Sequence, residues 1–395
     1  MKYNHSFSSA NILLPKENIE NWATVACDQY TSEPEYWEGV KKVAGDKPSA
    51  LNIILPEVYL SADNSERIDN INKTMREYLQ NNIFNEYPDA LIYVERIQSD
   101  GKCRRGIVGK IDLESYDYRS GTDAEIRATE QTVLSRIPPR VEIRKNAPLE
   151  MPHVMLLFDD VKDTVFTYLD SNKSAFQKLY DFTLMCNAGS IKGYLLSEDA
   201  KTFVLKQFET LKQQKDGFLF CVGDGNHSLA TAKECYNLNK TEASRYALTE
   251  VVNIHDTALE FEPIYRVVFG VNPELLLQEF VKTLGEGTQK FTCVYGDVEK
   301  EIGVNPTAKL AVGTLQAFLD DYVKSHPEAE IDYIHGENSL KKLASRENSI
   351  GFIFDGMQKS ELFDAVNQDG SLPRKTFSMG HADDKRFYIE ARKIK

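Results

Sequence analysis

The stretch Phe218–Asn239, FLFCVGDGNHSLATAKECYNLN, carries the pattern that decides the expected fold. An apolar run at 218–222 is typical of a buried strand, and the alanine-rich segment after Ser228 is typical of a helix. Two glycines, an aspartate, an asparagine and a histidine lie between them. A strand-to-helix corner needs one glycine and one capping residue, so this corner holds more polar chemistry than a turn requires.

A corner of this kind can bind an anion. The first N–H groups of a helix have no acceptor within the helix, and the helix dipole is positive at the same end. With a helix that begins at residue 228 or 229, we expect phosphate to be bound by Gly223, Gly225, Asn226, His227 and Ser228. A capped tight turn, with Asn226 or Ser228 as the cap, accounts for the same residues without a ligand.

Asp224 is the acidic residue of this corner. A carboxylate does not bind an anion directly, but it can hold a divalent cation or accept a proton, and phosphoryl transfer uses both. We therefore expect Mg²⁺ as a cofactor, with Asp224 as its ligand and as a catalytic residue. His227 is the second catalytic candidate of the corner, because it can donate to phosphate oxygens.

Two familiar phosphate loops fit this stretch poorly. The sequence has no G-x-x-x-x-G-K-[ST] motif, so it does not indicate a P-loop kinase. Gly223 and Gly225 followed by Ser228 half-match G-x-G-x-x-G/A, which leaves an NAD-dependent oxidoreductase as an alternative function.

The segment GDGNHSLATAK, 223–233, resembles the D-G-[HN]-H-[RS]-x-x-A signature of the bacterial and archaeal family called domain of unknown function 1015. Three more segments resemble that family: RATEQTV at 127–133, NIHDTALEFEPIYR at 253–266 and LPRKTFSMGHADDKRFYIEARKI at 372–394. The signature is also similar to that of the ParB/sulfiredoxin superfamily, in which a loop and a helix N-terminus bind nucleotide phosphates. That superfamily includes free L-serine kinases. The resemblance implies a ParB/sulfiredoxin-like phosphate-binding core.

The chain departs from that superfamily at two positions. Ser228 stands where the superfamily has arginine, so another cation must compensate. Asn226 stands where sulfiredoxins need a cysteine, which excludes sulfiredoxin chemistry.

The stretch VACDQYTSEPEYW near the N-terminus supplies the first further candidates. The resemblance implies that this stretch lies early in the fold and forms part of a pocket. We therefore expect Asp28, Tyr30 and Thr31 to bind substrate, and a surface turn is the alternative.

The segment 123–137 is expected to form a helix that carries Arg127, Glu130 and Arg136 on neighbouring turns. Glu130 is then a candidate catalytic base, and the two arginines bind phosphate or carboxylate of the substrate. A salt-bridged helix face is the alternative.

The last candidates lie towards the end of the chain. Arg266 is expected to bind substrate, unless it forms a buried pair with a glutamate. Arg374, Lys375 and His381 can supply the positive charge that the corner lacks at position 228, unless they lie on a solvated tail.

Composition excludes several classes of partner. The chain has 395 residues and a net charge of −13, which repels phosphate backbones, so we expect no nucleic-acid partner. Its apolar runs are shorter than the roughly 18 residues that a membrane span needs, and its start shows no signal-peptide pattern. We expect a cytoplasmic protein without a membrane partner. The six cysteines form no C-x-x-C pair, so neither a zinc site nor a disulfide framework is expected.

Strand-like and helix-like segments interleave along the whole chain, which predicts a mixed α/β fold. Segments 90–98 and 106–118 are expected to form a hairpin, and 171–184 a helix. We place a core domain at 1–270, with its phosphate-binding loop at 223–228, and a further α/β portion at 271–395.

These observations together favour a phosphotransferase that acts on a small hydroxyl substrate, and the resemblance narrows it to a free L-serine kinase-like enzyme. The sequence shows no recognisable adenine-binding pocket, so the expected phosphate donor stays open between ATP, ADP and pyrophosphate. A non-catalytic nucleotide-sensing protein would use the same corner as a switch and stays an alternative beside the oxidoreductase. The oligomeric state is not legible from the sequence.

Overall fold

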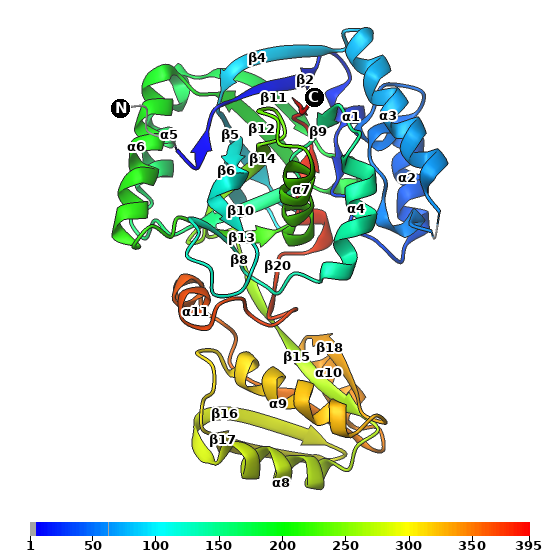
Figure 1. The fold of residues 1–395 in the computed structure, drawn as a ribbon, viewed down its shortest axis with the longest axis vertical. Helices are drawn as coiled ribbons and strands as arrows, with labels where there is room; N and C mark the ends of the chain where they lie inside the picture. The colour runs from blue at the N-terminus through cyan, green and yellow to red at the C-terminus, as the bar shows by residue number, and fades with distance from the viewer. Residues whose placement is uncertain (1–4, 62) are drawn as a thin grey trace. The chain divides into compact units, whose positions relative to one another are not determined.

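The computed structural model describes residues 5–61 and 63–395 and divides the chain into two compact units (Figure 1). The first unit contains residues up to 128, 132–259 and 381–395, and the second contains 129–131 and 260–380. This division differs from the expected boundary at residue 270, because residues 260–270 belong to the second unit and residues 381–395 return to the first. The mixed α/β class is confirmed.

The first unit is built on a mixed sheet of ten strands within the described residues, in the order β11-β12-β5-β6-β14-β10-β13-β8-β7, with β1 paired to β6. The pairs β10–β14, β13–β8 and β7–β8 are parallel, and the other pairs are antiparallel. The strands are β1 (Phe7–Ser8), β5 (Ile92–Ile97), β6 (Cys103–Asp112), β7 (Tyr116–Asp117), β8 (Ile126–Ala128), β10 (Val154–Phe158), β11 (Gln177–Thr183), β12 (Ser190–Leu195), β13 (Phe220–Asp224) and β14 (Tyr246–Asn253). The hairpin expected across 90–118 is confirmed as β5 and β6.

Helices and short strand pairs complete this unit (Figure 1). Its helices are α1 (Ile19–Trp22), α2 (Pro34–Ala44), α3 (Ser65–Gln80), α4 (Ile137–Arg144), α5 (Thr164–Asn172), α6 (Glu198–Gln214) and α7 (Asn226–Leu238). Its strand pairs are β2 (Ala10–Pro15) with β4 (Phe84–Ala90), β3 (Thr24–Val25) with β21 (Phe387–Tyr388), and β9 (Leu149–Glu150) with β22 (Arg392–Lys393). Side chains of β5 alternate between two hydrophobic clusters, since Tyr93 lies in one and Ile92 and Val94 lie in the other. The sheet is therefore buried on both faces.

Two expected helices are wrong. Residues 123–137 contain the strand β8 and a short 3₁₀ turn, because β8 adds in parallel to β13 and buries Ile126 and Ala128. Residues 171–184 end α5 and then form β11, which pairs with β12 and buries Tyr180. Short apolar runs fit either period, so sheet pairing decides their structure.

The second unit has its own six-stranded sheet within the described residues, in the order β17-β16-β19-β15-β18, with β20 paired to β15. Its strands are β15 (Phe261–Phe269), β16 (Glu286–Tyr295), β17 (Val298–Val304), β18 (Glu330–His335), β19 (Ser349–Ile353) and β20 (Phe377–Met379). Its helices are α8 (Pro273–Leu284), α9 (Ala311–Ser325), α10 (Glu337–Ala344) and α11 (Leu362–Asp369). Phe280 packs against Phe291, Phe318 and Phe352 to form an aromatic core.

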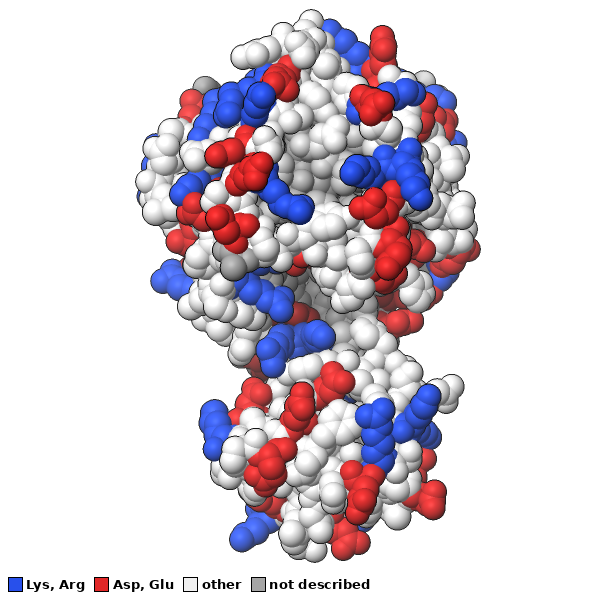
Figure 2. Space-filling model, turned by 90° about the vertical axis from the view of Figure 1, so that its right-hand side faces the viewer, with Lys and Arg blue, Asp and Glu red and all other residues white. Residues whose placement is uncertain are grey.

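Across the described residues, no helix has both the length and the apolar character to cross a membrane. Figure 2 shows Lys and Arg side chains interspersed with Asp and Glu side chains on the face that it displays. The absence of a nucleic-acid partner stays a prediction.

A cluster of buried charges fixes residues 381–395 onto the ten-stranded sheet. Glu250 on β14 is fully buried, and its Oε2 atom lies 3.0 Å from Nη1 of Arg386. Nε of Arg104 lies 3.7 Å from Glu250 Oε1 on the other side. Arg386 also pairs with Glu390, to which the Tyr180 hydroxyl donates at 2.5 Å. The C-terminal segment is thus held by ions that water does not reach.

Removing the charge of Glu250 should destabilise the first unit strongly. Glu250→Gln leaves Arg386 and Arg104 buried with one carboxylate fewer, and breaking a buried pair costs about 3–5 kcal/mol. Both tryptophans, Trp22 and Trp37, lie in the first unit, so their fluorescence during urea unfolding reports on this unit alone.

Glu77→Gln is the matched control, because Glu77 pairs with Lys73 on the exposed surface of α3. That change should cost less than about 1 kcal/mol. Equal losses for the two variants would contradict an anchoring role for Glu250.

Candidate functional site

The corner after β13 is a helix N-terminus with a glycine cap. β13 ends at Asp224, Gly225 is the N-cap with φ of 82°, and α7 begins at Asn226, earlier than the expected residue 228 or 229. Neither Asn226 nor Ser228 is therefore the cap, and Gly225 has no side chain to accept from the first turn. The N–H groups of Asn226, His227 and Ser228 have no acceptor within the helix. The geometry is that of an anion-binding helix start.

Packing also requires both glycines of the corner. The register between β13 and β10 shifts by a bulge at position 223, and a Cβ on Gly223 would lie 2.8 Å from Leu157 Cγ. A Cβ on Gly225 would lie 3.1 Å from both His153 Cδ2 and Val154 Cα. Gly225 thus permits the positive φ and also the close approach of the His153 ring.

Asp224 is paired with a cation that the sequence analysis did not identify. Its Oδ1 atom accepts the Gly225 N–H at 2.9 Å, and its Oδ2 atom lies 3.3 Å from Nζ of Lys385. Lys385 lies next to Arg386 in the C-terminal segment, so the buried charge cluster positions it. The positive charge that Ser228 does not supply is thus present as Lys385.

His227 is neutral in the folded chain. The Val133 N–H donates to His227 Nε2 at 3.2 Å, so the ring proton lies on Nδ1. Burial, followed by the charges of Arg140 and Arg136, lowers the pKa of His227 to about 4. Both arginines come from α4 and the turn before it, and α4 packs beside α7 (Figure 1). His227 can therefore donate from Nδ1 without being protonated.

A carboxylate–imidazole pair lies beside the corner. His153 Nε2 is 3.0 Å from Asp28 Oδ2, and His153 Nδ1 is 2.7 Å from the hydroxyl of Tyr388, which also accepts the Cys27 N–H. Burial opposes both charges, but Asp28 raises the pKa of His153 well above its ordinary value, and His153 in turn lowers the pKa of Asp28. Lys385 also lowers the pKa of Asp28, so this pair and Asp224 share one cation.

A cavity of about 170 Å³ opens beside the first turn of α7. Ser228 and Thr231 form its wall on α7, and most of the other wall residues are apolar. The lining residues are Cys27, Ile53, Ile54, Leu55, Glu57, Leu60, Met75, Arg140, Ile143, Arg144, Met151, His153, Ser228, Thr231 and Tyr388.

The structure gives different surroundings to the other predicted residues of the first unit. Tyr30 donates to Asp383 and stacks on Tyr36, and Thr31 is exposed. Arg127 is buried on β8, donates to the Ala124 carbonyl and lies 4.1 Å from the ring of Phe218. Arg136 is exposed near His227, and His381 is exposed at the start of a short 3₁₀ turn. Among the predicted residues of the first unit, Asp28 and Arg136 interact electrostatically with His227 of the corner.

The second unit contains the remaining predicted residues. The Glu130 carboxylate accepts the N–H groups of Lys375 and Thr376 at 3.1 and 3.2 Å. Arg266 is fully buried, and its Nε donates to Gln316 Oε1 at 2.6 Å. Three cations surround the Tyr333 ring, at centroid distances of 4.6 Å for Arg266 and 5.2 Å for each of Arg374 and Lys375. The predicted helix that joined Arg127, Glu130 and Arg136 is wrong, because β8 and a loop take its place.

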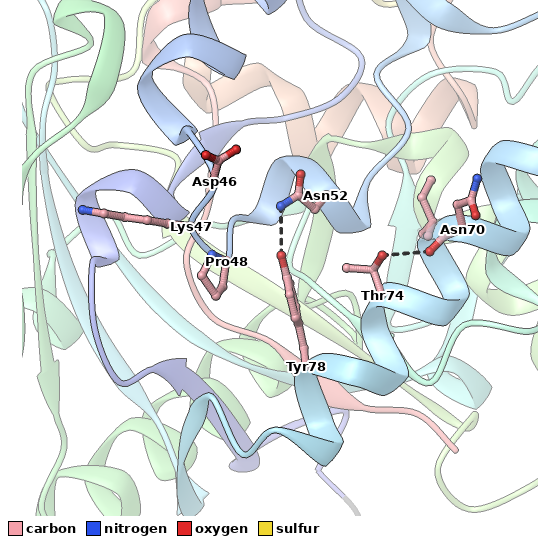
Figure 3. A pocket seen from close by; sticks show the side chains of 8 residues that line it. Asp46, Lys47, Pro48, Asn52, Asn70, Thr74 and Tyr78 are labelled. Carbon is pink, nitrogen blue, oxygen red and sulfur yellow. Dashed lines mark hydrogen bonds between the residues drawn. The ribbon is translucent and has the colours of Figure 1, made fainter.

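A second depression of the first unit, of about 420 Å³, lies between α3 and the 3₁₀ turn Ala50–Ile53 (Figure 3). Asn52 Nδ2 donates to the Tyr78 hydroxyl at 3.0 Å, and Thr74 donates to the Asn70 carbonyl at 2.9 Å. These polar groups satisfy one another, and no predicted site residue lines this depression.

Sequence reasoning missed His153, Lys385 and Tyr388. His153 directly precedes a run of five buried residues, VMLLF, and a histidine at a strand end was the available signal. Lys385 and Tyr388 lie in a segment already compared with a family, but nothing in their spacing shows that they meet residues 224 and 153.

A family model described as "Protein of unknown function (DUF1015)" matches residues 9–393. No curated protein matches the sequence. A free serine kinase in complex with AMP is 11% identical with a TM-score of 0.42, over 72% of this chain and 91% of that chain. A conserved hypothetical protein from Pyrococcus furiosus is 12% identical with a TM-score of 0.38, over 72% and 94%. SbnI from Staphylococcus aureus, truncated at its C-terminus, is 12% identical with a TM-score of 0.38, over 71% and 82%. Likeness at this level leaves function to be inferred from the residues of the chain itself.

The lowered pKa of His227 predicts a specific dependence of stability on pH. The unfolded imidazole has an ordinary pKa of 6.5 and the folded one a pKa of about 4. Between these values the unfolded chain binds a proton that the folded chain does not, so stability rises with pH across this window. As pH falls from 7 to 4.5, the wild type should lose stability relative to His227→Gln. Urea midpoints from tryptophan fluorescence measure the difference, and a difference that stays constant with pH would refute the assignment.

Proposed function

We propose that this chain, which belongs to the DUF1015 family, is a phosphotransferase that acts on a small hydroxyl substrate. The observation that carries the proposal is the glycine-capped start of α7, whose first N–H groups have no acceptor within the helix. Lys385, which pairs with Asp224, and the His153 imidazolium, which lies close to Gly225, are the neighbouring cations. Backbone donors and fixed cations of this kind stabilise the charge on a transferring phosphoryl group.

The donor's phosphates would bind to the N–H groups of Asn226, His227 and Ser228. His227 would add its Nδ1–H, which the contact from Val133 leaves as its protonated nitrogen. Oδ1 of Asn226 is buried and has no hydrogen-bond partner among the described residues. A buried acceptor without a partner costs about 1–3 kcal/mol. Phosphate oxygens cannot satisfy it because they also accept, but the O–H of the hydroxyl substrate could donate to it and remove the cost. Arg136, which is exposed beside His227, would meet the outer oxygens.

In this proposal, a carboxylate of the first unit activates the substrate hydroxyl by accepting its proton. Asp224 and Asp28 both interact with Lys385, whereas both carboxylate oxygens of Glu130 accept backbone N–H groups of the second unit. We therefore favour Asp224 as the group that accepts the hydroxyl proton, because the lowered pKa of Asp28 makes that carboxylate a weaker base.

The side chains near the corner could supply only part of the coordination of a Mg²⁺ ion. Among the described residues, no group of three or more His, Cys, Asp and Glu side chains is arranged to hold a metal ion. Mg²⁺ in phosphoryl-transfer sites is commonly held by one or two carboxylates together with substrate phosphates, which Asp224 can provide with the donor. The ion would neutralise charge on the phosphates, and Lys385 would compete with it for Asp224.

The finer proposal is that the acceptor is free L-serine and that the donor is ATP, ADP or pyrophosphate. It rests on the resemblance of residues 223–233 to the phosphate-binding signature of the superfamily that includes free L-serine kinases. The NAD-dependent alternative fits less well. β13 and β14 flank β10 in opposite directions, whereas a dinucleotide-binding crossover joins parallel strands.

Lys385→Met should weaken binding of the phosphate donor. A hydrogen bond to a charged group contributes about 1.5–3 kcal/mol, which is roughly a 10- to 150-fold change in affinity. Calorimetry with ATP, ADP and pyrophosphate measures it. Lys393→Met is the matched control, because Lys393 lies in the same segment but pairs with Glu86 at the surface. Equal affinities for the two variants would remove Lys385 from the phosphate site.

Asp224→Asn should lower kcat by about 10²-fold or more while the chain stays folded. The assay incubates the protein and Mg²⁺ with L-serine or another hydroxyl amino acid and each donor, and detects the phosphorylated product by mass spectrometry. Near-normal turnover in the variant would make Asp224 a turn residue. Donor binding without product for any acceptor would instead support the nucleotide-sensing alternative.

A further inference from the structure

The thiol of Cys27 lies at the end of a carboxylate–imidazole–thiol series. Asp28 Oδ2 is 3.0 Å from His153 Nε2, and the opposite ring nitrogen, Nδ1, is 3.8 Å from Cys27 Sγ. The carboxylate fixes the ring on one side, and the ring faces the sulfur on the other. Nucleophilic cysteines are activated by this order of groups.

The imidazole of this series is held in its charged form. Asp28 raises the pKa of His153 well above its ordinary value despite burial. A positive charge beside a thiol stabilises the thiolate, which is the nucleophilic form. Tyr388 adds a second contact to Nδ1, at 2.7 Å, and therefore limits rotation of the ring.

The surroundings of the thiol define what it can react with. Cys27 lines the cavity of about 170 Å³ beside α7 and is itself half-buried. The cavity wall near it is mostly apolar, with Ile53, Leu55 and Met75 among its residues. A small and largely apolar molecule fits this wall, because its hydrocarbon part would leave water and pack against these apolar side chains.

We propose that Cys27 is a nucleophilic thiol that takes small apolar electrophiles into this cavity, with His153 as the cation that stabilises its thiolate and Asp28 as the residue that orients the imidazolium. The sulfur electron pair forms the new C–S bond, and the bond from that carbon to its leaving group breaks. With an alkyl iodide the leaving group departs as iodide, and the proton of the original thiol is released to solvent when the thiolate forms beside the His153 imidazolium. The proposal does not depend on phosphoryl transfer.

Iodoacetamide at pH 7 tests the proposal on the full chain, with the labelling rate of each cysteine read from its peptide by mass spectrometry. Cys186 is the internal reference, because it is more exposed than Cys27 and burial raises its pKa. Exposure alone predicts faster labelling of Cys186. Activation predicts that Cys27 is labelled about three- to tenfold faster, since an adjacent cation raises the thiolate fraction but reduces the intrinsic nucleophilicity of the sulfur.

His153→Gln should remove this advantage, and His255→Gln should not. His255 is a matched control, because it pairs with Asp159 at 2.7 Å in the same unit but lies in another charge cluster. Labelling of the buried Cys221 reports any unfolding of the variants. If His153→Gln unfolds, the comparison of Cys27 with Cys186 in the wild type still decides the matter.

A second probe tests the cavity. N-butyl-iodoacetamide adds four apolar carbons to the same reactive group, so it should label Cys27 several-fold faster than iodoacetamide and leave the rate at Cys186 unchanged. Slower labelling of Cys27 than of Cys186, or no effect of His153→Gln, would overturn the nucleophile. An equal response of both cysteines to the butyl group would overturn the role of the cavity.

Discussion

The ion pair between Glu250 and Arg386 is the interaction on which the candidate site depends. It holds the C-terminal segment against the middle of the ten-stranded sheet, and the residues on either side of Arg386 then reach the corner. Lys385 meets Asp224, and Tyr388 meets His153. Space for the buried carboxylate comes from Gly106, where a Cβ would lie 2.3 Å from Glu250 Oε1. A buried ion pair contributes little net stability but is costly to break. The pair therefore holds the C-terminal segment in one position on the sheet.

Gly225 meets two structural requirements of the corner at once. Gly225 adopts a positive φ that caps α7, and its missing side chain lets the His153 ring approach. The turn explanation and the site explanation of the glycines are therefore not exclusive. The same backbone that ends β13 also brings the His153 imidazolium close to the first turn of α7, where we propose that phosphate binds.

The sequence predicted the local parts of this arrangement and missed the distant ones. The strand, the glycine corner and α7 follow from periodicity and residue type within one short stretch, and so does the β5–β6 hairpin. The helix expected at 123–137 failed because pairing with β13 overrides an ambiguous apolar pattern. Lys385, His153 and Tyr388 were missed because each meets its partner across more than 100 residues of sequence. Contacts at that separation are set by the packing of the whole unit, which no local pattern records.

Charge balance explains why the candidate site can accept an anion without being unstable when empty. Lys385 and the His153 imidazolium are the cations of its centre, and Asp28 and Asp224 are the carboxylates that neutralise them. Arg140 beside them is already paired with Glu57. A phosphate group brings about two negative charges at neutral pH, so the centre alone would become anionic when a donor binds. The additional positive charge must come from the start of α7, from the exposed Arg136, or from a divalent cation that arrives with the donor. In the proposed function, a donor that arrives with a divalent cation would therefore bind to this neutral centre at a lower electrostatic cost than the bare anion.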